Sequence, residues 1–149
     1  MSNNHDDKAM EILEKAVYYA QAQLEARQKF QPFAMLLNKN GNIDTIENSI
    51  KDSSECYESL GETVKGCIAK DNIEIMVMVV DTLIPDNFAK EVPNSIRVHL
   101  EERSQIDKKI AARFLYVPYT LHKVEEKILT KLHVPIPVGF PAEYIVNSK

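Results

Sequence analysis

The chain has 149 residues, with 18 basic and 22 acidic side chains, a formal net charge of −4, two cysteines and no tryptophan. This length suits one domain, and the apolar fraction of 44% and charged fraction of 27% are typical of a globular protein rather than a disordered or fibrous one. The acidic balance argues against a dedicated nucleic-acid binder, whose affinity depends on many contacts from Lys and Arg to phosphate.

The sequence carries no signal for secretion or membrane insertion. Residues 1–8 are polar and acidic, and the longest aliphatic run, residues 75–80, is far shorter than the roughly 20 residues that span a bilayer. Cys56 and Cys67 fall on one predicted helix, about 16 Å apart at 1.5 Å per residue, so no disulfide joins them. Two free thiols predict a cytoplasmic protein.

The N-terminal part predicts a helix followed by a hairpin. Apolar side chains fall on one arc of residues 7–28, as in an amphipathic helix. Residues 33–37 predict a buried strand and residues 43–48 a short returning strand. Between them, Gly41 follows an asparagine, and this pair is typical of a tight turn.

Residues 53–70 predict a second helix. Asp52 and the serines after it offer N-terminal caps, and an apolar arc runs along one side. Gly61 lies at the edge of that arc, where a glycine costs about 1 kcal/mol relative to Ala. It therefore indicates close contact between this helix and a sheet.

Three further strands follow. Residues 73–80 are apolar on both faces, as in a strand that is covered on both sides. After a proline-bracketed loop at 85–94, residues 96–103 alternate between apolar and charged side chains, and residues 110–119 predict another strand.

The C-terminal part is ambiguous. Residues 121–133 have helical spacing of apolar side chains but adjoin a strand, so they are either helix or strand. Residues 134–149 contain three prolines and predict an extended tail that packs along the body or against a partner.

Together these elements predict one α+β domain over residues 1–149. Their order is helix, two strands, helix and three strands, with residues 121–133 as a final element for which the spacing favours a helix. An antiparallel sheet of about five strands, covered by helices in two or three layers, satisfies this order.

This order of elements resembles the roadblock, longin and profilin-like group of small α+β domains, whose members commonly pair through their sheets or helices. A second resemblance, to small bacterial proteins of unassigned function, covers about residues 30–119. It rests on Phe30, Gln31, Pro32, Phe33, Gly41, Arg97, Val98, His99, Leu100, Glu101, Pro118 and Tyr119. The two resemblances imply a fold and a tendency to pair, but no activity and no catalytic residue.

The best candidates for chemistry are Arg97, His99 and Glu101. The period of a strand places them on one face about 7 Å apart, and Tyr116 joins them if the last two predicted strands pair. A His beside a Glu suits acid–base chemistry, and an Arg binds anions. A solvent-facing row of charges explains the same pattern more simply, so the sequence assigns no catalytic residue.

Other signatures of catalysis are missing. The four glycines form neither a phosphate-binding loop nor a dinucleotide-binding motif, and no C-x-x-C or H-E-x-x-H pattern occurs. A metal site on His99 and Glu101 requires a third ligand from Asp81, His122 or His133, which no spacing brings near. The sequence therefore predicts no metal and no cofactor.

The strand pattern also predicts one mixed sheet face. It combines Met76 and Met78 with the charged row and with Phe114 and Tyr116, and it is too apolar to stay uncovered. The first helix, the C-terminal tail or a second subunit are the candidates to cover it. Met76, Met78, Phe114 and Tyr116 are therefore candidate interface residues.

The mixed face and the missing motifs favour a non-enzymatic cytoplasmic domain that acts through protein–protein contact, as a homodimer. Residues 1–96 carry 9 basic and 16 acidic side chains, whereas residues 97–131 carry 8 and 5, and these opposite charges attract. The alternative is a small-molecule or anion-binding domain, with weak enzymatic activity as one option, that uses Arg97, His99, Glu101 and Tyr116.

Overall fold

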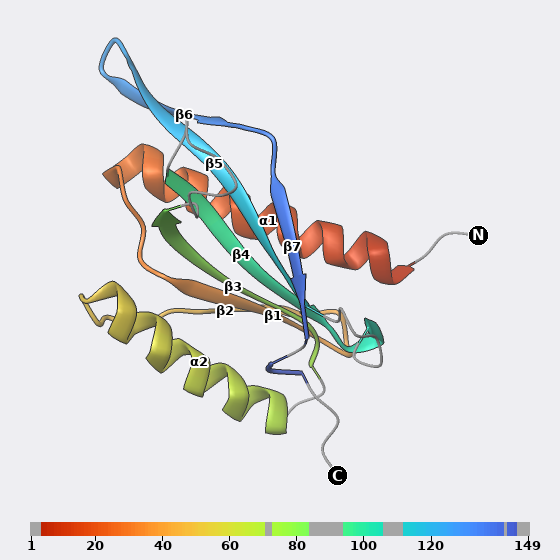
Figure 1. The fold of residues 1–149 in the computed structure, drawn as a ribbon. Helices are drawn as coiled ribbons and strands as arrows, with labels where there is room; N and C mark the ends of the chain where they lie inside the picture. The colour runs from red at the N-terminus through yellow and green to blue at the C-terminus, as the bar shows by residue number, and fades with distance from the viewer. Residues whose placement is uncertain (1–3, 71–72, 84–93, 106–111, 142, 146–149) are drawn as a thin grey trace.

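The computed structural model describes residues 4–70, 73–83, 94–105, 112–141 and 143–145. They form one antiparallel sheet with a helix on each face (Figure 1), so the predicted α+β fold is confirmed. The elements are α1 (Asn4–Arg27), β1 (Phe33–Asn38), β2 (Ile43–Ile46), α2 (Ser53–Lys70), β3 (Ile73–Leu83), β4 (Asn94–Glu102), the 3-10 turn η1 (Arg103–Gln105), β5 (Ala112–Val124), β6 (Lys127–Leu132) and β7 (Ile136–Phe140). The loop expected at 85–94 lies outside the described residues except for Asn94, which begins β4.

The strands lie in the order β2-β1-β3-β4-β5-β6. Both β2 and β3 are antiparallel to β1, so they run parallel to each other, and α2 connects them across β1. The long strand β5 has two neighbours on one side, because its first half pairs with β7 and its second half pairs with β6. In Figure 1 the β5–β6 hairpin projects beyond the rest of the sheet.

The larger apolar core lies between the sheet and α1. Alternate side chains of β1, β3 and β4 point to this face, where they meet the apolar arc of the helix. The helix contributes four fully buried side chains, those of Ile12, Ala16, Ala20 and Leu24. The small alanines let the helix approach the sheet closely, as the periodicity predicts.

The opposite face of the sheet carries a smaller core beneath α2. Cys56, Leu60 and Val64 of α2 are buried against the intervening side chains of β1 and β3, which include Met76 and Met78. Ile145, beyond the last strand, is also fully buried in this core. Both cysteines are unpaired, in agreement with the sequence.

Local sequence accounts for several boundaries. The helix α1 ends where Gln28 takes a φ of 63° and donates its N–H to the carbonyl of Leu24 at 2.7 Å. In the β1–β2 turn, Gly41 has a φ of 87°, as its lack of a side chain permits. At the start of α2, Asp52 Oδ1 accepts the N–H of Glu55 at 2.9 Å, so the predicted cap is confirmed.

The sheet has seven strands rather than about five. The helix favoured for residues 121–133 is wrong, because these residues form the outer half of β5 and the strand β6. Side chains of α1 hold this hairpin: Glu25 Oε2 accepts the N–H of Thr130 at 2.7 Å. The expected C-terminal tail contributes β7, which completes the sheet beside β5.

Among the described residues, neither helix is long and apolar enough to cross a membrane.

Candidate functional site

The strand β4 carries Arg97, His99 and Glu101 on the face that α2 covers. In the pairing of β4 with β5, Arg97 lies opposite Tyr116 and His99 lies opposite Phe114. The structure therefore brings all four ligand-binding candidates onto one face, as the alternation of the strand predicts. Their surroundings differ greatly from one end of the row to the other.

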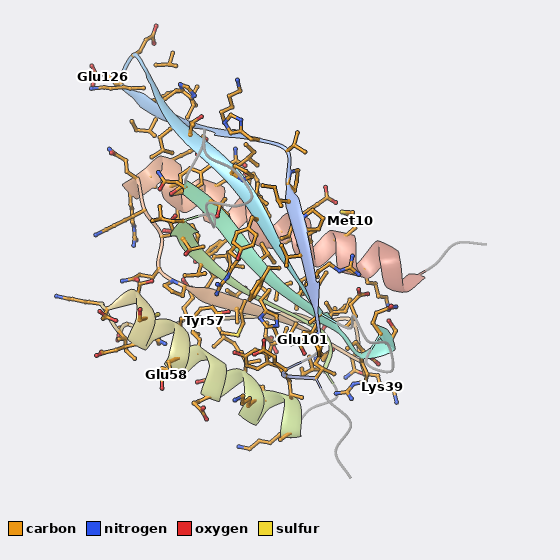
Figure 2. The ribbon with its side chains drawn as sticks, viewed as in Figure 1. Met10, Lys39, Tyr57, Glu58, Glu101 and Glu126 are labelled. Carbon is orange, nitrogen blue, oxygen red and sulfur yellow. The ribbon has the colours of Figure 1, made fainter. Side chains whose placement is uncertain are left out.

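Glu101 is fully buried, and its carboxylate holds the C-terminal segment. Oε1 accepts the backbone N–H groups of Tyr144 and Ile145 at 2.9 and 2.8 Å, and Oε2 accepts that of Glu143 at 2.9 Å. Three successive N–H groups that point at one carboxylate form a strong, charge-assisted arrangement. Figure 2 shows Glu101 between the sheet and α2, near the end of the described chain.

His99 supplies the fourth contact to this carboxylate. Its Nε2 lies 2.7 Å from Oε2 of Glu101, and the imidazole is 2% exposed. A carboxylate can only accept hydrogen bonds, so Nε2 carries the proton. The rings of Phe114 and Tyr144 stand edge-on to the imidazole at centroid distances of 5.3 and 5.2 Å, and they fix its orientation.

Tyr144 connects the C-terminal segment to α2. Its hydroxyl lies 3.2 Å from the position that a Cβ on Gly61 would occupy, and Lys65 Nζ lies 5.6 Å from the centroid of its ring. The close neighbour of Gly61 is thus this tyrosine, whereas the sequence indicated contact with a sheet. The missing side chain at Gly61 makes room for the C-terminal segment.

Burial and hydrogen bonding act in opposite directions on Glu101. Burial alone would raise its pKa, but the hydrogen bonds from His99 and from the three backbone N–H groups outweigh it, so the pKa lies below its usual value. For Tyr144, burial and the nearby Tyr57, Glu143 and Glu101 raise the pKa to about 12. The carboxylate is therefore charged, and the phenol is neutral, at neutral pH.

Arg97 lies at the other end of the row, between two aromatic rings. Its Cζ is 4.4 Å from the centroid of Phe114 and 5.3 Å from that of Tyr57 on α2. Its Nε is buried and has no hydrogen-bond partner. Neither ion pair found among the described residues involves this guanidinium.

These surroundings divide the four candidates for ligand binding. Glu101 and His99 are buried, and the Glu101 carboxylate accepts hydrogen bonds from other residues of the same chain. This pair therefore has a structural role and is not accessible to a substrate. Tyr116 is 7% exposed. Of the four, Arg97 is the one that combines partial exposure with a permanent charge, and it takes part in neither ion pair of the described residues.

The mixed sheet face is covered within the chain. Met76 and Met78 are fully buried beneath α2, which the sequence does not indicate as a cover, and neither reaches the surface of the molecule. The C-terminal tail, one of the expected covers, also packs on this face through Tyr144 and Ile145. Phe114 is partly exposed, and its ring lies against Arg97 and His99. The two methionines therefore present no surface to a partner.

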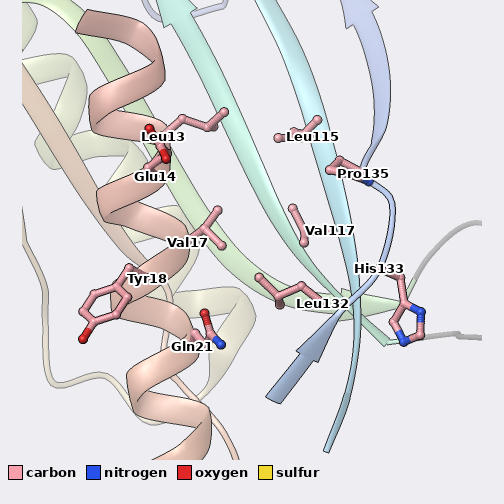
Figure 3. A pocket seen from close by; sticks show the side chains of 10 residues that line it. All are labelled: Leu13, Glu14, Val17, Tyr18, Gln21, Leu115, Val117, Leu132, His133 and Pro135. Atoms are coloured by element: carbon pink, nitrogen blue, oxygen red, sulfur yellow. The ribbon is translucent and has the colours of Figure 1, made fainter. Parts of the chain in front are cut away.

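An open, mainly apolar surface lies on the opposite side of the sheet, between α1 and β5 (Figure 3). Two hollows of about 570 and 580 Å³ share the lining residues Leu13, Leu115 and Pro135, so they form one groove along the helix. Figure 3 shows Leu13 and Val17 pointing from α1 toward the strands, and Tyr18 pointing away from them. We refer to this feature as the α1 groove.

The α1 groove is mainly apolar and is bordered by exposed apolar side chains. Met10, Tyr18 and Leu132 line it and are 54%, 73% and 37% exposed, and Val134, beside the lining residue Pro135, is 83% exposed. Polar groups lie at one end, where Arg113 and Glu102 approach to 3.9 Å. No pattern in the sequence reveals this groove, because α1, β5 and the β6–β7 connection meet only in the folded chain.

The two histidines that the sequence offers as third metal ligands lie on or directly after the projecting β5–β6 hairpin. His122 Nε2 and His133 Nε2 lie 3.0 and 3.3 Å from Oγ1 of Thr120. Thr120 follows Phe114, the partner of His99, by six residues, which is about 20 Å along a strand. In the part of the chain that the structure describes, no three His, Cys, Asp or Glu side chains are placed to hold a metal ion.

Comparisons with protein-family profiles, curated proteins and solved structures give no match to this chain. The two resemblances drawn from the sequence therefore stay predictions.

Proposed function

We propose that the protein is a non-enzymatic, cytoplasmic interaction domain that forms a homodimer through the α1 groove. The observation that carries the proposal is the clustering of exposed Met10, Tyr18 and Leu132 around apolar hollows. Exposed apolar surface of this kind, with polar groups at its edge, is typical of protein interfaces. The free thiols of Cys56 and Cys67 fit a reducing compartment.

A second copy of the chain is the occupant that best suits this surface. The α1 groove presents hollows and projecting side chains side by side, and a two-fold axis requires one surface that complements itself. Tyr18 points away from the hollow of its own chain and supplies such a projection. The two hollows lie side by side along α1 and adjoin exposed apolar side chains, an arrangement that is typical of a protein interface.

The test compares two pairs of surface substitutions by sedimentation velocity between about 1 and about 100 μM protein. Met10→Lys with Tyr18→Lys changes the border of the groove, and both sites are exposed enough for the fold to tolerate them. Leu83→Lys with Val124→Lys is the matched control, since these side chains are 67% and 51% exposed away from the groove. We expect the first pair to raise the dimer dissociation constant at least about tenfold and the control to leave it unchanged. A wild-type protein that is monomeric throughout, or an equal effect of the control, would refute the proposal.

A second candidate function, anion binding, is favoured by Arg97. A guanidinium held between Tyr57 and Phe114, with a buried Nε that has no hydrogen-bond partner, presents a positive charge that suits a small oxyanion. This candidate retains one member of the predicted ligand-binding row and leaves His99 and Glu101 to their structural contacts.

Thermal melting in inorganic phosphate tests this second candidate. We expect phosphate to raise the melting temperature of the wild type and of Arg113→Gln, an exposed control, but not that of Arg97→Gln. An equal rise in all three proteins would show a general salt effect and would eliminate Arg97 as a specific site.

A further inference from the structure

The C-terminal arm, defined as β7 together with residues 141 and 143–145, is held firmly at its far end. Glu143, Tyr144 and Ile145 each donate a backbone N–H to Glu101, and the Ile145 side chain fills the core beneath α2. All of these contacts join the arm to other parts of the chain, namely β4, α2 and the sheet. The body of the domain thus forms a receptor for this arm.

The root of the arm is loosely packed in comparison. Val134 is 83% exposed, and Pro135 and Pro137 are exposed as well. Pro135 also lines both hollows of the α1 groove, so empty space lies beneath the connection. A connection with few contacts costs little free energy to reorient.

The prolines favour an arm that stays extended when it leaves the body. Proline restricts φ and so limits the conformations of the released arm, which lowers the entropy that is lost when the arm binds again. In β7 itself, Pro137 lies opposite Leu115 and has no N–H to donate into the ladder. The pairing of β7 with β5 is therefore weaker than that of an uninterrupted strand.

We propose that two copies of the chain exchange their C-terminal arms, so that Glu101 of one copy holds residues 143–145 of the other. The occupant is the C-terminal arm of a second copy, because the receptor already binds this same segment within one chain. Reciprocal exchange preserves every contact of the arm and adds only a change at residues 134–135, which is why exchange of a terminal segment is an economical route to a dimer. The inference rests on the proposed homodimer and specifies how its two chains are joined.

Disulfide trapping tests the exchange in the full-length protein. Arg113 and Gly139 are partners in the β5–β7 ladder and both are exposed. Opposed residues of antiparallel strands have Cα atoms about 4.5–5.5 Å apart, a distance that a disulfide spans. The variant carries Arg113→Cys and Gly139→Cys with Cys67→Ser, while Cys56 is fully buried and stays in place.

After mild oxidation, arm exchange predicts covalent dimers at about 100 μM protein and intrachain disulfides at about 1 μM, because exchange between copies depends on concentration. The two single-cysteine variants are the controls for chance collisions. If collisions cause the covalent dimers, the single-cysteine variants form covalent dimers too. Intrachain disulfides at every concentration would overturn the exchange. Sedimentation of the same samples then separates the arm exchange from the homodimer proposal. Intrachain disulfides in a non-covalent dimer would refute the arm exchange and retain the groove interface, whereas intrachain disulfides in a monomer would refute both proposals.

Discussion

The backbone N–H of Ile145 donates a hydrogen bond of 2.8 Å to Oε1 of Glu101, although 44 residues separate them in the chain. This bond and its two neighbours attach the end of the described chain to the middle of the sheet. The Glu101 carboxylate therefore positions the C-terminal arm. Through this arm it connects the core beneath α2 to β7. In the arm exchange that we propose, this one buried group also joins the two copies.

Replacing Glu101 by Gln is expected to destabilise the fold by about 3 kcal/mol, the lower end of the range found when one partner of a buried charged contact is removed. The amide places an NH₂ group against N–H donors that the carboxylate accepted, so at least one contact becomes repulsive. Urea unfolding measures the effect. Glu143→Gln is the matched control, because its side chain is exposed and only its backbone N–H is used, and we expect a change below about 0.5 kcal/mol.

Acid is expected to remove the contribution of Glu101. Its pKa is lower in the folded protein than in the unfolded chain, where a Glu titrates near about 4.3. The unfolded state thus binds the proton first, and the stabilisation is complete above about pH 5 and declines as the pH falls below about 4. The stability difference between wild type and Glu101→Gln should shrink over that window. A difference that stays constant from neutral to acid pH would show that the charge contributes nothing.

The two glycines of α2 are expected to respond differently to Ala. Gly66 has no neighbour within 4 Å of an added Cβ, so Gly66→Ala should stabilise the protein by about 0.5–1 kcal/mol through helix propensity. At Gly61 the new Cβ would lie 3.2 Å from the Tyr144 hydroxyl, and this contact should cancel much of the same gain. A double-mutant cycle of Gly61→Ala with Tyr144→Phe measures the coupling, which we expect to exceed about 0.5 kcal/mol. Additive effects would mean that the hydroxyl does not restrict position 61.

The β5–β6 turn is expected to gain stability from Glu125→Asn. Glu125 has a φ of 59°, a left-handed conformation that Asn adopts more readily than other residues with side chains. We expect a gain of about 0.5 kcal/mol, seen as a rise of about 1–2 °C in thermal melting. Glu126→Asn, at a position without a positive φ, should leave the melting temperature unchanged or lower it.

The helices were predictable from the sequence, but the β5–β6 hairpin was not. The apolar periods of α1 and α2 and the Asp52 cap are local signals, and the structure follows them. The hairpin turns at Glu125 and Glu126, which lack the Gly or Asn that identifies a tight turn, and its apolar spacing imitates a helix. Contact with α1, more than 100 residues away in the chain, holds it as strands.

The candidate site was predictable only in part. The alternation of β4 correctly places Arg97, His99 and Glu101 on one face, because that depends on local geometry alone. The sequence also predicts that this face is covered and offers the C-terminal tail as one cover, but it gives no sign of α2, whose packing on this face arises only in the folded chain. The bonds to Glu101 come from backbone N–H groups, which every residue except proline carries, so they leave no trace in the sequence.

Hydrogen exchange at low and high protein concentration tests the central claim, self-association through the α1 groove, most directly. We expect that raising the concentration from about 1 to about 100 μM slows hydrogen exchange in the groove-lining part of α1, residues 10–21, and around residues 132–135, and leaves the exchange of α2 unchanged. Exchange that is independent of concentration at these residues, or protection that appears on α2 instead, would contradict it.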